Sequence, residues 1–144
     1  MSHVTSIDIE ISDLTALEAA VREMGGTFLR NKKNYGWYGR SVGDYPLPAG
    51  FTADMLGKCE HAVGLKGTEY EIGVVRNPAK PNKYTLLYDF WGPGAKLKTH
   101  FGDGLTKLKQ MYGVHAATLA AKKKGYFVAR KQVGNTIKLQ ITGV

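Results

Sequence analysis

The sequence has little of three features that mark well-known classes of protein. It contains a single cysteine, Cys59, so no disulfide can form within the chain, and a reducing compartment is expected. No apolar run approaches the roughly 18 residues that a membrane-spanning helix needs. The N-terminal stretch, MSHVTSIDIE, lacks the basic and apolar regions of a secretory signal. We therefore expect a cytoplasmic protein with no membrane contact.

Patterns that bind phosphate or metal are also missing. Neither G-x-x-x-x-G-K-[ST] nor G-x-G-x-x-G after a strand occurs, which disfavours a nucleotide-hydrolysing enzyme. Cys59 and His61 lie two residues apart, but no second cysteine or paired histidine stands at zinc-ligand spacing. A Cys–His nucleophile would need a third, orienting group such as Asp89. We therefore expect no cofactor, no metal and no enzyme, with Cys59, Asp89 or His115 as the residues that an enzyme would use.

Positive charge is in excess and unevenly placed. The chain has 20 Lys and Arg against 12 Asp and Glu, a net charge of +8. Residues 1–29 carry one cation and five anions, whereas residues 90–144 hold ten cations and one anion, Asp103. A basic protein attracts phosphate-rich partners over long distances, although in many basic proteins the positive charge serves solubility alone.

Hydrophobic periodicity gives the elements of the first half. Residues 7–11 alternate isoleucine with charge, which predicts a half-buried strand. Residues 13–26 place apolar side chains on one helical face, and Gly25–Gly26 ends that helix. A second strand begins at 27–29. Residues 41–57, with two prolines and three glycines, predict a long loop.

The second half begins with strands at about 59–66, 68–76 and 84–91. The 84–91 strand is apolar on nearly both faces, which is typical of a central strand. Residues 92–98 predict a linker, and 101–124 a helix with a kink or split at Gly113. A hairpin turning at Gly134-Asn135 closes the chain.

This order of elements predicts an α+β fold over residues 1–144 as a single domain. The economical arrangement is a mainly antiparallel sheet with two helices packed on one face. The order would also fit a doubled β-α-β-β unit, although the sequence shows no internal repeat.

Two basic stretches are candidates for contact with a polyanion. In the first, RNKKNYGWYGR at 30–40, cations could contact phosphates while aromatic rings stack on bases. Period two would put Tyr35 and Trp37 on one face and Tyr38 on the other, so only one set can face a ligand. The alternative is a purely structural role, in which the rings pack on the core and the cations are solvated. The candidate nucleic-acid-binding residues are Arg30, Lys32, Lys33, Trp37, Tyr38 and Arg40 in the first stretch and Lys122, Lys123, Lys124, Arg130 and Lys131 in the second.

A candidate buried polar network involves the central strand and the long helix. Asp89 stands on that strand and needs a partner, since an unpaired buried carboxylate is costly. His115 or Arg40 could supply it, and Tyr112 lies one helical turn from His115. The network could be structural or could line a ligand pocket.

Three stretches carry a resemblance over nearly the whole chain. They are MSHV before an isoleucine-rich strand, YEIG followed by a strand ending in DFWG, and QMYGVH running on to KGYFV. In this order they resemble the family of hypothetical chloroplast reading frame thirty-five, small proteins of cyanobacteria, red-algal plastids and other bacteria, with similar proteins in bacteriophages. The resemblance implies a compact cytoplasmic or stromal domain of unknown function and no catalytic residues. The 41–57 loop, the 92–98 linker and the strong basic charge depart from that pattern and fit a phage-encoded member.

The sequence thus predicts a non-enzymatic basic protein that binds a polyanion, namely nucleic acid with little sequence specificity. The alternative is a protein-interaction module, for example a phage-encoded inhibitor of an acidic host protein acting in the host cytoplasm. The oligomeric state does not follow from the sequence.

Overall fold

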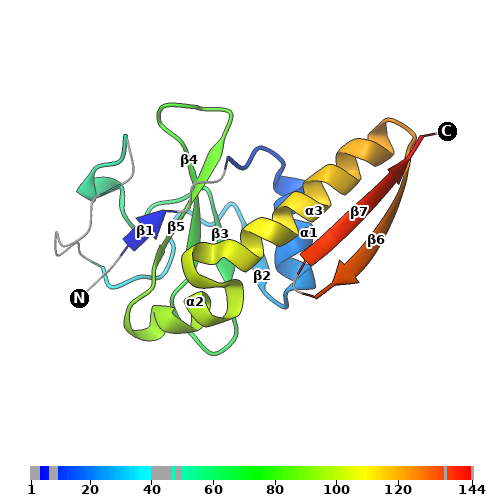
Figure 1. The fold of residues 1–144 in the computed structure, drawn as a ribbon. Coiled ribbons are helices and arrows are strands. Elements are labelled where there is room, and N and C mark those ends of the chain that lie inside the picture. Colours follow the sequence, from blue (N-terminus) through cyan, green and yellow to red (C-terminus); the bar gives the residue numbers. More distant parts are fainter. Residues whose placement is uncertain (1–3, 7–9, 40–46, 48–49, 135, 144) are drawn as a thin grey trace.

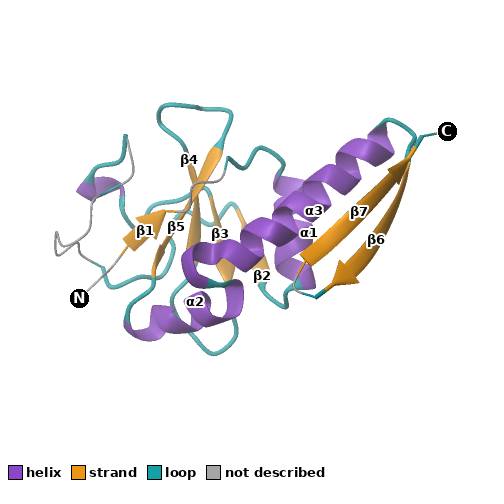
Figure 2. Ribbon diagram, in the orientation of Figure 1, coloured by secondary structure: helices purple, strands orange, loops and turns teal. Residues whose placement is uncertain are grey.

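The computed structural model describes residues 4–6, 10–39, 47, 50–134 and 136–143. A five-stranded sheet has the order β1-β5-β4-β3-β2, and all its neighbouring strands are antiparallel (Figures 1 and 2). Its strands are β1 (Val4–Ser6), β2 (Thr27–Arg30), β3 (His61–Gly64), β4 (Ile72–Arg76) and β5 (Tyr84–Asp89). With the helices described next, this arrangement confirms the α+β class.

The described residues form three α-helices rather than the expected two. They are α1 (Leu14–Glu23), α2 (Ala95–Phe101) and α3 (Thr106–Lys123). The hairpin of β6 (Phe127–Val133) and β7 (Thr136–Thr142) forms a two-stranded sheet of its own. The closing hairpin therefore does not extend the main sheet, and the second half of the chain does not repeat the strand pairing of the first. None of the helices in the described part of the chain is long and apolar enough to cross a bilayer.

The three helices pack on one face of the five-stranded sheet. The Asp13 side chain caps α1 by accepting a hydrogen bond from the Ala16 amide at 3.0 Å. Apolar side chains on α1, α2 and α3 bury this face almost completely, and removing that surface from water is the main force holding the layers together. The core residues include Leu17, Val21, Leu97, Phe101, Leu108 and Tyr112 from the helical layer and Val63, Ile72, Val74, Leu86 and Tyr88 from the sheet.

A loop covers the opposite face of the sheet. Tyr35, Phe51 and Leu56 pack there against Ala62 and Leu87 of the sheet, so the loop residues form a second core. A Cβ at position 73 would lie 2.3 Å from the Tyr35 ring, and only glycine lets this ring approach the sheet so closely. Of the 41–57 loop, residues 47 and 50–57 are described, and they include a 3₁₀ turn at Ala53–Met55. This part of the loop is thus a cover of the sheet.

Several element boundaries differ from the sequence prediction. Of the strand expected at 7–11, residues 7–9 lie outside the described residues, and Ile11 forms an isolated bridge to Tyr84. The expected linker at 92–98 is a 3₁₀ turn followed by the start of α2. Helix α3 runs unbroken through Gly113, and the chain instead turns between α2 and α3 at Gly102 and Gly104, with φ of +93° and +64°.

Helix α3 separates the C-terminal hairpin from the main sheet. One side of α3 packs on α1 and another on β6 and β7. Figure 1 shows the far half of α3 and the hairpin extending together away from the five-stranded sheet. The hairpin is therefore held mainly by one helix and lies apart from the main core.

Candidate anion-binding cleft

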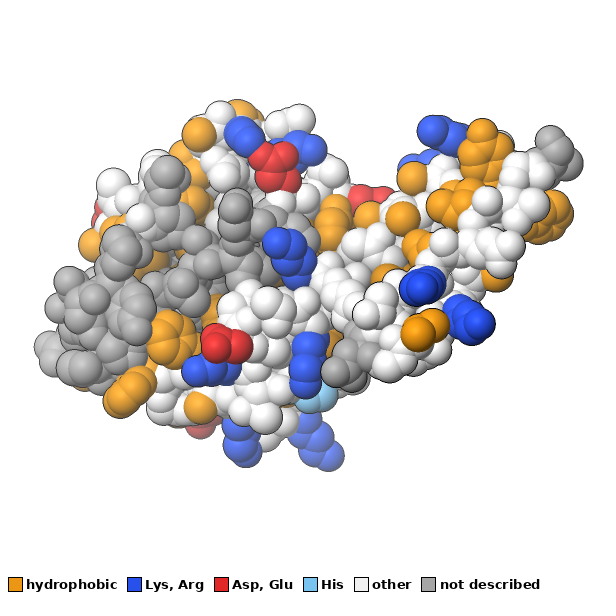
Figure 3. All heavy atoms as spheres, in the orientation of Figure 1, with side chains coloured by type: hydrophobic (Ala, Val, Ile, Leu, Met, Phe, Trp, Pro, Cys, Tyr) orange, Lys and Arg blue, Asp and Glu red, His pale blue; other side chains and the backbone are white. Residues whose placement is uncertain are grey.

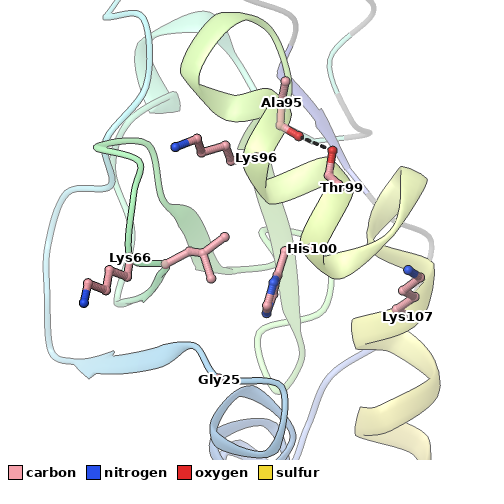
Figure 4. Close-up of a pocket in the computed structure, with 8 residues that line it drawn as sticks. Gly25, Lys66, Ala95, Lys96, Thr99, His100 and Lys107 are labelled. Atoms are coloured by element: carbon pink, nitrogen blue, oxygen red, sulfur yellow. Dashed lines mark hydrogen bonds between the residues drawn. The ribbon is translucent and has the colours of Figure 1, made fainter.

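An open cleft lies where the end of α1, the β3–β4 turn, α2 and the start of α3 meet (Figure 4). Its volume is about 760 Å³. Among the described residues, three lysines and one histidine line it, and no carboxylate does. The lining residues are Gly25, Leu65, Lys66, Ala95, Lys96, Thr99, His100 and Lys107.

Local structure sets the positions of these cationic side chains. Lys66 stands on the β3–β4 turn, which Gly67 makes tight with its φ of +98°. The Lys96 ammonium group donates to the Gly67 carbonyl oxygen at 2.8 Å, which fastens α2 to that turn. Lys107 lies in the first turn of α3, directly after the glycine break that separates α3 from α2. Three separate elements therefore bring lysines to the walls of one cleft, and Figure 4 shows the Lys66 ammonium group directed outward from its rim.

His100 joins two walls of the cleft. Its Nε2 lies against the carbonyl oxygen of Met24, at the end of α1. A carbonyl oxygen can only accept a hydrogen bond, so Nε2 carries the proton in this arrangement and Nδ1 remains as the second polar atom of the ring. The ring also meets Phe101 edge to face, with centroids 4.9 Å apart. Figure 4 shows His100 directed toward the turn at Gly25.

The electrostatics of the cleft favour an anion. Within the described residues, Lys66, Lys96 and Lys107 form no ion pair with a carboxylate. Like charges that share one cleft repel one another, and a bound anion relieves that repulsion. A phosphate oxygen accepts hydrogen bonds from lysine, and these are among the stronger hydrogen bonds in proteins. The cleft can therefore hold phosphate groups.

The cations predicted at 30–40 are mostly used within the fold. Arg30 donates to Glu18 at 2.9 Å and lies over the Phe28 ring. Lys32 donates to Glu71 at 2.6 Å. Lys33 is exposed and forms no ion pair within the described residues, whereas Arg40 lies outside the described residues. Two of the predicted phosphate contacts are thus held by carboxylates.

The aromatic residues of the same stretch divide as the alternation predicted. Tyr35 is buried at 3% exposure, and Trp37 lies half-buried beside it, with ring centroids 6.5 Å apart. Tyr38 is 42% exposed. Strand β2 ends at Arg30, so these three aromatic residues divide in this way although they lie outside a regular strand. Trp37 packs against Gly57 and Tyr35, which leaves Tyr38 as the more accessible ring.

The predicted C-terminal cations fall in several places. Lys122, Lys123 and Lys124 are exposed at the end of α3, and Lys123 lines a polar depression of about 580 Å³ together with Arg30 and the start of α1. Arg130 donates to Glu23 at 2.7 Å. Lys131 stands opposite Lys138 across the β6–β7 hairpin. The second basic stretch is therefore not one continuous surface.

The prediction that Asp89, Tyr112 and His115 form one network is wrong, because the three side chains contact different partners. Buried Asp89 accepts hydrogen bonds from the backbone amides of Tyr38 and Trp91. The Tyr112 hydroxyl accepts from the Ser12 and Asp13 amides, both at 3.2 Å, just before α1 begins. His115 Nε2 lies 2.7 Å from Glu23 Oε1 at the end of α1. Tyr112 and His115 thus join α3 to α1, and Asp89 holds a different part of the fold.

Cys59 and His61 do not form a pair either. The Cys59 thiol donates to the Lys32 carbonyl oxygen at 3.1 Å, and burial raises the pKa of this thiol to about 11. His61 Nδ1 accepts from the Asn31 amide at 3.0 Å, and its ring stacks on Phe28. Burial lowers the pKa of His61. Cys59 belongs to the core on the loop side of the sheet, so the two side chains have separate surroundings. Within the described residues, no group of three His, Cys, Asp or Glu side chains could hold a metal ion.

Sequence reasoning missed the cleft residues Lys66, Lys96, His100 and Lys107. The excess of cations in residues 90–144 was the available signal for Lys96 and Lys107. No local sequence pattern marks Lys66 as a site residue, because only the contact of its turn with α2 brings it to the cleft.

Comparison with known proteins adds no identification. No known family model, curated protein or solved structure matches the chain. The resemblance to the chloroplast reading-frame family stays a prediction. The function therefore has to be inferred from the geometry and charge of the molecule itself.

Proposed function

We propose that the protein is a non-enzymatic binding protein that holds nucleic acid through the cationic cleft. The observation that carries this proposal is the lining of the cleft, where the described residues include three lysines and a histidine and no carboxylate. Lysine ammonium groups contact phosphate oxygens and read no base edge, so the protein binds with little sequence preference.

The distribution of charge supports the same proposal. The ten cations of residues 90–144 face one anion in that segment, and they add to the field around the cleft. Such a field raises the rate at which a polyanion meets the protein. Lys98 and Lys109 lie on α2 and α3 close in sequence to the cleft residues, and they extend the positive surface along both helices.

Binding of labelled DNA at several salt concentrations tests the proposal. At about 50 mM salt we expect clear binding of an oligonucleotide in fluorescence anisotropy, because electrostatic affinity is greatest there. Three lysine–phosphate contacts give a slope of about −2 in a plot of log K against log salt for a single strand. Changing the base sequence should alter the affinity little. Absence of binding to DNA and RNA at that low salt would refute the proposal.

One feature favours a second candidate function, that of a protein-interaction module. Phe127 and Val133 are 70% and 45% exposed on the outer face of the hairpin, and Lys131 stands directly opposite Lys138 on the same face. Figure 3 shows hydrophobic and cationic side chains together on the hairpin lobe at the right of the view. Like charges placed opposite one another destabilise a strand pair, and an acidic side chain from a partner would relieve that. We propose an acidic protein as this second partner.

Co-purification after nuclease treatment separates the two candidates. An acidic protein recovered with the wild-type chain, and lost with a Phe127→Ala/Lys131→Ala variant, would favour the interaction module. The same partner should stay bound to a variant lacking the cleft lysines. Recovery of nucleic acid without a protein, before nuclease treatment, would favour the cleft.

A further inference from the structure

A buried carboxylate at the end of β5 supports two exposed aromatic residues. Asp89 has no exposed surface, and its two oxygens serve different chain segments. Oδ2 accepts from the backbone amide of Tyr38 at 3.2 Å, and Oδ1 accepts from that of Trp91 at 3.0 Å. The side chain of Tyr38 is 42% exposed and that of Trp91 is 51% exposed.

These hydrogen bonds hold the backbone of both ring-bearing residues to one carboxylate. A buried carboxylate is tolerated only where hydrogen bonds replace its hydration, so Asp89 holds both backbone segments firmly. Large exposed aromatic rings forgo the free energy that burial would provide. In the described part of the chain, the other exposed large hydrophobic side chains all belong to the hairpin segment, at Tyr126, Phe127, Val133 and Ile141. Tyr38 and Trp91 are therefore exposed aromatic residues separate from those of the hairpin.

The segments that bear the two rings lie at the end of the sheet that also carries the cationic cleft. Trp91 directly precedes the 3₁₀ turn at Gly92–Gly94, which leads into α2 and Lys96. Five residues of helical chain span only about 8 Å. The Thr68 hydroxyl donates to the Pro93 carbonyl oxygen at 2.8 Å, so the turn that bears Lys66 is tied to the segment after Trp91. Phosphate-binding and ring-bearing groups thus share one end of the sheet.

We propose that Tyr38 and Trp91 form a stacking platform for unpaired bases, and that the ligand of the cleft is single-stranded nucleic acid. This inference rests on the proposed function. Bases within a duplex already stack on each other, whereas those of a single strand can stack on aromatic side chains. The cleft lysines hold the phosphates while the rings take the bases. Every base has an aromatic face, so the platform adds affinity for single strands without adding sequence specificity.

Asp89 acts in this proposal as a positioning residue. It touches no base, and its role is to fix the backbone of Tyr38 and of Trp91. An Asp89→Asn variant keeps one acceptor oxygen and loses the other, so one of the two segments is released. We expect this variant to lose part of the preference for single strands while its phosphate-dependent binding of duplex persists.

The test compares an oligo(dT) strand and a duplex of the same length, both about 20 nucleotides long, with four proteins. These are the wild type, Trp91→Ala, Tyr38→Ala and, as a matched control, Phe127→Ala, which removes a 70% exposed ring from the hairpin. Removing a stacking ring should weaken oligo(dT) binding about tenfold. Duplex binding should change little, and the control should match the wild type on both ligands. Equal binding of oligo(dT) by the wild type and Trp91→Ala, or an equal loss on both ligands, would overturn the platform.

The outcomes also separate this inference from the proposed function. If the wild type binds neither ligand at low salt, the proposed function and the platform are both refuted. If Trp91→Ala binds oligo(dT) as well as the wild type does, only the platform is refuted. Tryptophan fluorescence gives a second readout, because the chain has two tryptophans and Trp37→Phe leaves Trp91 alone. Oligo(dT) should quench the fluorescence of that variant, and duplex at equal occupancy should not. Quenching of the same size by both ligands would count against the platform.

Discussion

Residues 1–89 and residues 90–144 use their charge in different ways. The first region has ten cations and eleven anions, and the second has ten cations and one anion. Ion pairs within the first region join Glu18, Glu60 and Glu71 to arginine or lysine partners. In the second region, Arg130 and His115 reach across to Glu23 of α1. The comparison teaches that charge in the first region mainly serves the fold, whereas the cleft takes Lys96 and Lys107 from the second region and Lys66 from the first.

Burial follows the same division. Strand β5 is buried along its whole length, and β3 and β4 are buried at most positions. In the hairpin, no described residue of β6 or β7 is buried. The stable core and the exposed cationic surface are therefore contributed mainly by different parts of the chain. Helix α2 and the start of α3 contribute to both the core and the cationic surface.

The largest expected effect comes from removing the cleft lysines. A Lys66→Ala/Lys96→Ala/Lys107→Ala variant should bind DNA about 100-fold more weakly at about 50 mM salt, because three phosphate contacts are lost. Fluorescence anisotropy measures this loss. The matched control replaces Arg22, Lys80 and Lys83 of the first region with alanine and changes the net charge equally. Equal losses in the two variants would show that net charge alone drives binding, and would contradict a specific role for the cleft lysines.

The second prediction concerns the stability of the first region. Gly73→Ala places a Cβ 2.3 Å from the Tyr35 ring, and overpacking of this kind costs about 2 kcal/mol of unfolding free energy. Gly113→Ala is the matched control, because its Cβ on α3 would meet no atom within 4 Å. This change should stabilise the protein by up to about 1 kcal/mol, since alanine favours a helix. Urea denaturation measures both, and a harmless Gly73→Ala would contradict the close packing of the loop on the sheet.

Third, Glu23→Gln should loosen the attachment of the hairpin. The hydrogen bond from Arg130, with help from His115, lowers the pKa of Glu23, so the interaction is present above the ordinary pKa of glutamate and is lost as the pH falls through the lowered value. These side chains are partly exposed, so the cost is at most about 1 kcal/mol. Hydrogen exchange should quicken in β6 and β7 and stay unchanged in β3 to β5. Glu18→Gln, which loses pairs with Arg22 and Arg30 only, should leave the hairpin protected.

The smallest effect is a pH dependence of stability that comes from His61. Burial lowers its folded-state pKa below the ordinary value of 6.5. As the pH falls below that ordinary value, the unfolded chain takes up a proton before the folded chain does, so stability decreases until the pH passes the folded pKa. Thermal unfolding of the wild type between neutral and mildly acidic pH should show this decline. A His61→Gln variant should show a shallower one, and an identical pH dependence in both proteins would contradict the assignment.

The sequence predicted the parts of the fold that depend on local pattern. Period two and turn residues located β3, β4 and β5, and the spacing of apolar residues located α1 and most of α3. The sequence pattern predicts a linker at 92–98 and not helix α2, because α2 has only seven residues and follows Gly-Pro-Gly. The break before α3 lies at two glycines with positive φ, whereas the isolated Gly113 costs too little to interrupt a long helix.

The site depends on contacts between distant residues, which the sequence does not reveal. Glu71, 39 positions away, takes up the charge of Lys32. The requirement that Asp89 find partners was predictable, but two of those partners are the backbone amides of Tyr38 and Trp91, which carry no sequence signal. The separation of the hairpin from the main sheet likewise depends on where α3 packs, and this is a property of the folded chain.

The most direct test of the cleft is a backbone NMR titration of the labelled protein with oligo(dT) at about 50 mM salt. We expect the largest amide shifts in residues 65–67, in 95–100 and around 107, with further shifts at 38 and 91, and we expect raised salt to reverse them. Shifts confined to 30–33 or to the hairpin, or no shifts at low salt, would contradict the assignment of the ligand to the cleft.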